Sequence, residues 1–93
     1  MKHHAWNPEK NEALKASRGI TFEDVVFYIE GGGLLDIVNH PNQAQYPGQQ
    51  VYVVSVEGYV YLTPFIESDQ DVFLKTIIPS RKATKHYLGV HDA

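Results

Sequence analysis

Two β-type segments joined by a two-residue turn restrict the fold of this 93-residue chain more than any other feature. Residues 51–56 are an apolar, β-branched run, which is typical of a strand. In residues 59–66, tyrosine and threonine side chains alternate with apolar ones, so one face of the expected strand is aromatic and the other apolar. Glu57 and Gly58 between the segments predict a tight hairpin turn, and Pro64 predicts a bulge or an edge near the end of the second strand. An antiparallel hairpin is therefore expected near the middle of the chain.

Helix signals lie on both sides of this hairpin. Asn7 followed by Pro8 predicts a helix start, and the helix is expected to run over residues 8–18. Thr21 and Asp24 match a capping box, and apolar residues at helical spacing follow them. The glycines at 31–33 are expected to end that helix. They are interpreted as a connector and not as a phosphate-binding loop, because no Lys-Ser/Thr follows them. Ser80 is a suitable N-cap for a last helix that closes at Gly89.

Further strands are expected over residues 2–6, 34–38 and 72–78, with a polar connection over residues 39–50. Successive hairpins favour an antiparallel meander with helices on one face. The sequence thus predicts a single α+β domain over residues 1–93. Its core is an antiparallel four-stranded sheet with N-terminal helices and a short C-terminal helix.

The net charge of −3 conceals a segregation of charge along the chain. Residues 21–74 hold eight acids and no Lys or Arg, whereas the two ends hold all eight bases. If the ends meet, they form a basic pole that attracts polyanions; otherwise these charges only solvate the surface. The chain has no cysteine, no apolar segment of about 18 residues and no signal-peptide core, so a cytoplasmic protein without a membrane partner is expected.

Residues 72–88 hold four of the eight Lys and Arg residues, together with one histidine. An apolar run ends at Pro79, which has no N–H to donate to a ladder. Arg81 and Lys85 then share one helix face, and Lys82 and His86 share the next. Lys75 interrupts the strand, which requires either a phosphate contact or an acidic partner such as Glu67 or Asp71.

Two segments, WNPEKNEALKASRGITFEDV (6–25) and FLKTIIPSRKATKHYL (73–88), resemble the BrnT family of type II toxins. Asp36 and His40 resemble the Asp and His that the family carries between its first two strands. Arg18 stands where the family has His, and Thr76 stands where it often has Arg. The resemblance implies a RelE-like ribonuclease fold, RNA as substrate and a cognate, DNA-binding antitoxin as partner, with a possible homodimer within the complex.

Metal-free RNA cleavage uses the 2′-OH as nucleophile, and the protein positions the backbone and stabilises charge on phosphorus. Arg81, at a helix start, is the first candidate for charge stabilisation. Arg18 and His40 are the other candidate catalytic residues, and His40 and His86 can move protons near neutral pH. The candidate substrate-binding residues are Lys10, Lys75, Lys82, Lys85 and His86.

No cofactor is expected, and the histidines lack the spacing of a metal site. The acidic turn at residues 67–71 is a candidate contact for a basic segment of the antitoxin. The alternative reading is a non-catalytic interaction module, or an inactive toxin relative, on the same scaffold.

Overall fold

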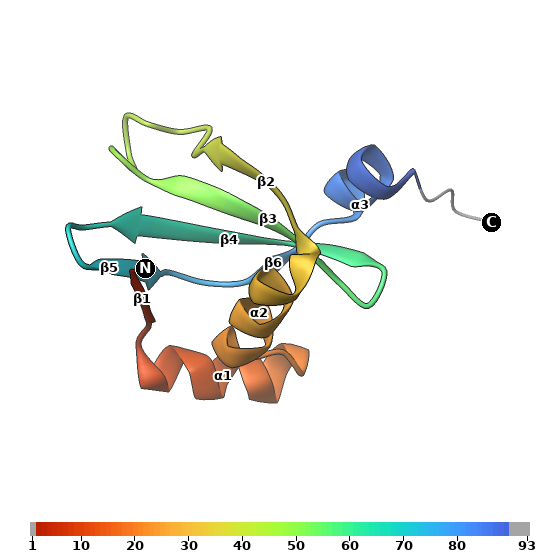
Figure 1. Cartoon of the computed structure of the whole chain (residues 1–93), viewed down its shortest axis with the longest axis horizontal. Helices are drawn as coiled ribbons and strands as arrows, with labels where there is room; N and C mark the ends of the chain where they lie inside the picture. The colour runs from red at the N-terminus through yellow and green to blue at the C-terminus, as the bar shows by residue number, and fades with distance from the viewer. Residues whose placement is uncertain (1, 90–93) are drawn as a thin grey trace.

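The computed structural model describes residues 2–89 and has an α+β fold (Figure 1). Its elements, in chain order, are β1 (His3–Ala5), α1 (Pro8–Arg18), α2 (Phe22–Tyr28), the π-helical turn η1 (Ile29–Gly33), β2 (Leu34–Asn39), β3 (Gln50–Val56), β4 (Tyr59–Glu67), β5 (Asp71–Leu74), β6 (Ile78–Pro79) and α3 (Arg81–Leu88).

The six strands form one mixed sheet in the order β1-β5-β4-β3-β2, with β6 paired to β4. β2 to β5 are antiparallel to their neighbours, as predicted, but β1 joins the edge of β5 in parallel. The predicted four-stranded antiparallel sheet is therefore wrong in strand number and in the direction of one strand. The strand expected over residues 2–6 is present as β1 with three residues, and the two-residue β6 is an addition.

The predicted strand over residues 72–78 is interrupted beside Pro64. β5 ends at Leu74, and the chain rejoins β4 only at Ile78. The N–H of Lys75 donates to the carbonyl of Pro64 at 2.8 Å. The N–H and C=O of one strand residue point to the same side of the strand. The N–H that Pro64 lacks would therefore have pointed into the gap between β5 and β6, where it has no strand partner to lose. A proline is thus tolerated inside a central strand.

The hairpin between β3 and β4 has the predicted turn. Glu57 and Gly58 have φ values of 51° and 81°, and two consecutive positive values are typical of a type I′ turn. The two strands then pair without a register shift from Val56 and Tyr59 to Gln50 and Phe65.

Helices α1 and α2 cover one face of the sheet (Figure 1). Leu14, Phe22 and Val25 are 3% exposed or less and pack against strand residues that include Val54 and Leu74. Burial of each such side chain contributes about 1.5–3 kcal/mol. This apolar layer is the main core.

Hydrogen bonds fix the ends of both helices and join them. The Asn7 side chain caps α1, and Thr21 and Asp24 form the predicted capping box of α2. Asn11 accepts a hydrogen bond from the N–H of Phe22 and donates one to Glu23, both at 2.7 Å. The bond from Asn11 lowers the pKa of the Glu23 carboxyl. Asn11 therefore holds α2 at a fixed angle to α1.

The three glycines do not simply end the second helix. α2 passes into the π-helical turn η1, in which Gly32 has a φ of 97°. A β-carbon on Gly33 would lie 2.8 Å from the carbonyl oxygens of Tyr28 and Ser55. The turn therefore needs glycine at Gly33 for space and at Gly32 for backbone conformation.

Candidate nucleic-acid interface on helix α3

Helix α3 lies on the sheet face opposite α1 and α2. Leu62 pairs with Val53, whereas the core residues Tyr61 and Val54 pair in the next register position. Successive side chains of a strand point to opposite faces, so Leu62 faces away from the core of α1 and α2. Leu62 lines a groove with residues of α3, which fixes the side on which that helix lies.

Two hydrogen bonds attach the first turn of α3 to Val60 near the start of β4, and two more order the start of the helix itself. Ser80 caps the helix by accepting from the N–H of Ala83 at 3.0 Å, and its own N–H donates to the carbonyl of Val60 at 3.0 Å. The buried hydroxyl of Thr84 accepts from the N–H of Val60 at 2.9 Å and donates to the carbonyl of Ser80 at 2.7 Å. Both backbone groups of Val60 are thus used to hold α3.

The far end of α3 is fastened to the edge strand. The hydroxyl of Tyr87 donates to a carboxylate oxygen of Asp36 on β2 at 2.8 Å. This hydrogen bond raises the pKa of the Tyr87 phenol. Asp36 was noted in the sequence, but its contact with Tyr87 joins positions 51 residues apart, and no local pattern indicated it.

A groove of about 360 Å³ runs between α3 and β4. Two of the predicted site residues, Lys82 and His86, line it, and they are one helical turn apart on the same face of α3. Leu62 and Ala83 give it an apolar floor, and Ser80 and Tyr87 complete the lining. Leu62 and Ser80 were not predicted as site residues.

Helix α3 presents only positive charge. Arg81, Lys82, Lys85 and His86 are all exposed, and no acid occurs among residues 81–88. Arg81 and Lys82 lie in the first turn, where the helix dipole disfavours cations. A bound anion would relieve this repulsion and would also accept from the backbone N–H groups of the first turn.

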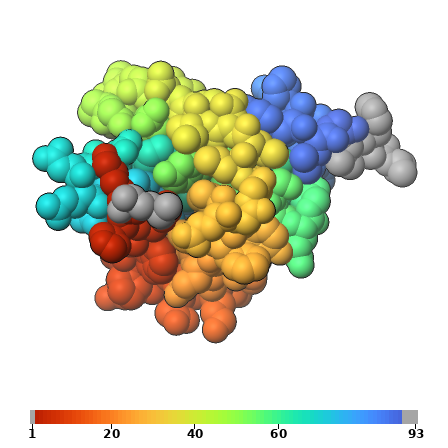
Figure 2. All heavy atoms as spheres, viewed as in Figure 1, coloured from red at the N-terminus to blue at the C-terminus, as the bar shows by residue number. Residues whose placement is uncertain are grey.

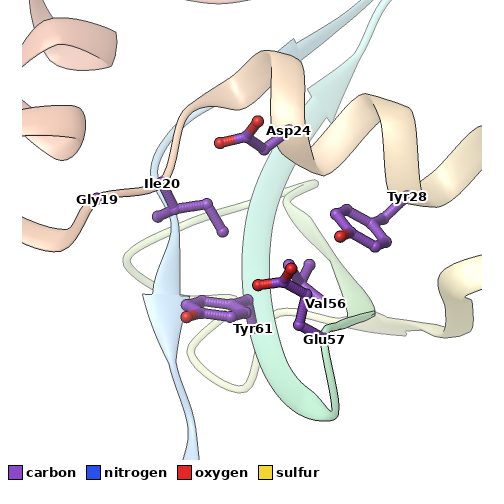
Figure 3. A pocket seen from close by; sticks show the side chains of 7 residues that line it. All are labelled: Gly19, Ile20, Asp24, Tyr28, Val56, Glu57 and Tyr61. Carbon is purple, nitrogen blue, oxygen red and sulfur yellow. The ribbon is translucent and has the colours of Figure 1, made fainter.

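Arg18 is close to the strand that leads to α3 but does not line the groove. Its guanidinium donates a hydrogen bond to the carbonyl of Ile77. The cavity beside the adjacent Gly19 has a volume of about 200 Å³ and is lined by Asp24 and Glu57 with two tyrosines (Figure 3). Carboxylates repel phosphate, so this cavity is unsuited to an RNA backbone.

The other predicted residues also lie away from the groove. His40 contacts the ring of Tyr46 at 4.4 Å between centroids, and its Nδ1 accepts from the N–H of Asn42 at 3.0 Å. Lys75 lies 5.5 Å from the centre of the Phe73 ring. Lys10 is exposed on α1. Of the eight predicted site residues, the structure groups the four on α3 and leaves Arg18, His40, Lys75 and Lys10 elsewhere.

Lys75 does not use either predicted acid in a salt bridge. Glu67 pairs instead with Lys2, whose Nζ lies 2.6 Å from a carboxylate oxygen of Glu67. The residue before β1 is thereby linked to the last residue of β4 across β5 at the surface. Within residues 2–89, no group of three or more His, Asp or Glu side chains has the geometry to hold a metal ion.

Comparison with protein-family models, with curated proteins and with solved structures finds no match to this chain. Among residues 2–89, no helix has the length and apolar character needed to cross a membrane.

Proposed function

We propose that this chain is a BrnT-like toxin of a type II toxin–antitoxin system, with a RelE-like fold and metal-independent endoribonuclease activity. One observation carries the proposal: a helix with four basic side chains and no acid borders a groove that contains Lys82 and His86. An RNA phosphodiester offers the negative charge that this surface lacks. The proposed fold and family rest on the sequence resemblance.

The proposed reaction is attack of the RNA 2′-oxygen on the adjacent phosphorus. The imidazole of His86 removes the 2′-OH proton, the bond to the 5′-oxygen breaks, and Lys82 supplies a proton to that oxygen. The products are a 2′,3′-cyclic phosphate and a 5′-OH. Arg81 stabilises the extra negative charge on phosphorus, and Lys85 holds a neighbouring phosphate. Arg18 and His40 take no part in this version of the mechanism.

Single-stranded RNA incubated with the purified protein and a chelator tests the proposal. We expect cleavage that leaves cyclic-phosphate ends. His86→Ala should slow cleavage by about 10²–10⁴-fold, the usual contribution of a general acid or base. Arg81→Ala should slow it by about 10²-fold or more. Lys15→Ala removes an exposed cation on α1, away from the groove, and should leave the rate unchanged.

The second candidate is a non-catalytic interaction module on the same scaffold. It is supported by the lining of the groove, which includes none of the three predicted catalytic residues, Arg81, Arg18 and His40. Salt-dependent RNA binding without strand cleavage at high protein concentration would favour this candidate. Cleavage that persists unchanged in His86→Ala would refute the proposed mechanism.

A further inference from the structure

Both carboxylate oxygens of Asp36 accept hydrogen bonds. Oδ1 accepts from the N–H of Ile37, and Oδ2 accepts from the hydroxyl of Tyr87, each at 2.8 Å. Figure 2 shows the segment that contains β2, in yellow, directly beside α3, in blue. Hydrogen bonds to a carboxylate are stronger than those between neutral groups, so the two donors restrict how Asp36 can turn. The Asp36 carboxylate is therefore a fixed point to which the side chain of Tyr87 is attached.

The ring of Tyr87 extends this attachment to the groove. Tyr87 lines the groove together with its neighbour His86. The phenol and imidazole rings lie at 86° to each other, and their centroids are 4.8 Å apart. Edge-to-face pairs of aromatic rings at such a separation attract each other. The Tyr87 ring, held at its hydroxyl by Asp36, thus lies against one side of the His86 imidazole.

The imidazole of His86 has few other restraints. The residue is exposed, and within residues 2–89 neither ring nitrogen has a hydrogen-bond partner. An exposed side chain without such contacts samples several rotamers, and fixing it in one of them costs entropy. The contact with Tyr87 is therefore the interaction that restricts the imidazole before RNA binds.

Asp36 does not itself line the groove, whereas Tyr87 and His86 do. Its hydrogen bond to Tyr87 is a direct physical route from β2 to the groove. Its negative charge is a second route, because α3 is basic and charges attract over longer distances than hydrogen bonds. The two routes can be separated, since one variant removes the charge and another removes the bond.

We propose that Asp36 is a positioning residue for His86 and that it acts through the Tyr87 ring. The inference rests on the proposed function, in which the His86 imidazole removes the 2′-OH proton. A general base works only within hydrogen-bond reach of that proton, and an imidazole that is already oriented reaches it more often. Loss of the bond between Asp36 and Tyr87 leaves the cations of α3 in place but lets both rings turn.

Cleavage kinetics on single-stranded RNA test the route through the hydrogen bond. Tyr87→Phe keeps the ring and the Asp36 charge but loses the bond, and it should lower kcat by about tenfold. Asp36→Ala should lower kcat to the same extent. Asp36→Asn removes the charge but keeps an oxygen that can accept from the phenol, so it should retain most of the activity. Glu12→Ala removes an exposed acid of α1 and should leave kcat unchanged.

Two further measurements separate positioning from a merely structural role. KM should change less than twofold in Asp36→Ala, because the phosphate-binding cations stay on a helix that Val60 still holds. In long incubations of the His86→Ala variant, adding Asp36→Ala should cause no further loss, because the proposed route ends at the imidazole.

Nuclear Overhauser effects between the ring protons of Tyr87 and His86 report on the same contact without RNA. They should be present in the wild-type protein, weaken in Asp36→Ala and Tyr87→Phe, and persist in Asp36→Asn. This measurement keeps the positioning proposal separate from the proposed function.

Four results would overturn the proposal. These are a rise in KM that parallels the fall in kcat, a further loss in the His86→Ala background, equal effects of Asp36→Asn and Asp36→Ala, and ring contacts that Asp36→Ala leaves intact. If the wild-type protein leaves RNA uncut, the proposed function fails, and the ring contacts then decide alone whether Asp36 orders His86.

Discussion

Replacement of Thr84 by valine tests how α3 is held to the sheet. The side chain is 4% exposed, and its hydroxyl is the hydrogen-bond acceptor for the N–H of Val60. Valine has nearly the same shape but leaves this buried N–H without a partner, which costs about 1–3 kcal/mol. The added apolar methyl offsets at most about 0.8 kcal/mol. We expect a net loss of about 1–2 kcal/mol in the free energy of unfolding.

The matched control is the same substitution at Thr63 on β4. Thr63 is 0% exposed, and its hydroxyl has no hydrogen-bond partner among the described residues. Thr63→Val therefore removes an unsatisfied buried polar group and should stabilise the protein by about 1 kcal/mol.

Urea denaturation, or thermal unfolding followed by circular dichroism, measures both variants. A change of 1 kcal/mol corresponds to roughly 4–8 °C in Tm for a domain of this size, so the two variants should lie on opposite sides of the wild type. If Thr63→Val destabilises the protein as much as Thr84→Val, hydrogen bonding does not explain how α3 is attached, and the reasoning fails.

Three further predictions concern other contacts. Tyr87→Phe should cost about 0.5–1 kcal/mol in unfolding free energy, and a double-mutant cycle with Asp36→Ala should show coupling, whereas independent effects would contradict the bond. The Glu23 carboxyl has a pKa below its ordinary value of 4.5, so its contribution to stability is present above pH 4.5 and is lost as the pH falls; Glu23→Gln should flatten this acid dependence in denaturation experiments. Gly33→Ala should destabilise by about 2 kcal/mol or more because its β-carbon would meet two backbone oxygens, whereas Gly31→Ala, with nothing within 4 Å, should be tolerated in thermal unfolding.

Sequence patterns correctly predicted the helix starts and the hairpin turn, which depend on interactions between residues close together in the chain. The caps Asn7, Thr21 and Ser80 and the turn at Glu57 and Gly58 depend on neighbouring residues, and the structure has all of them. The parallel pairing of β1 with β5 and the split of the last strand depend on residues far apart in the chain. The gap beside Pro64 in particular is set by a neighbouring strand, which one-dimensional patterns do not contain.

The candidate site was predicted in part for the same reason. Helical spacing correctly grouped Lys82 with His86 and Arg81 with Lys85 on α3. It did not give the bond from Tyr87 to Asp36, the apolar floor at Leu62 or the engagement of Arg18 with the Ile77 carbonyl. The first two depend on the face of the sheet to which α3 docks, and the third depends on how α1 packs beside the segment before β6; both become known only from the fold.

Because of the way in which α3 is attached, selection for binding acts on different residues from selection for folding. No residue of α3 belongs to the main core cluster, whose last member in the chain is Ile77. The charges on α3 can consequently vary between descendants of this chain at little cost to folding, provided that Ser80 and Thr84 keep their hydroxyl groups. Substitutions on α3 can then change what the helix binds with little loss of folding stability, whereas substitutions in the sheet and the first two helices affect the core.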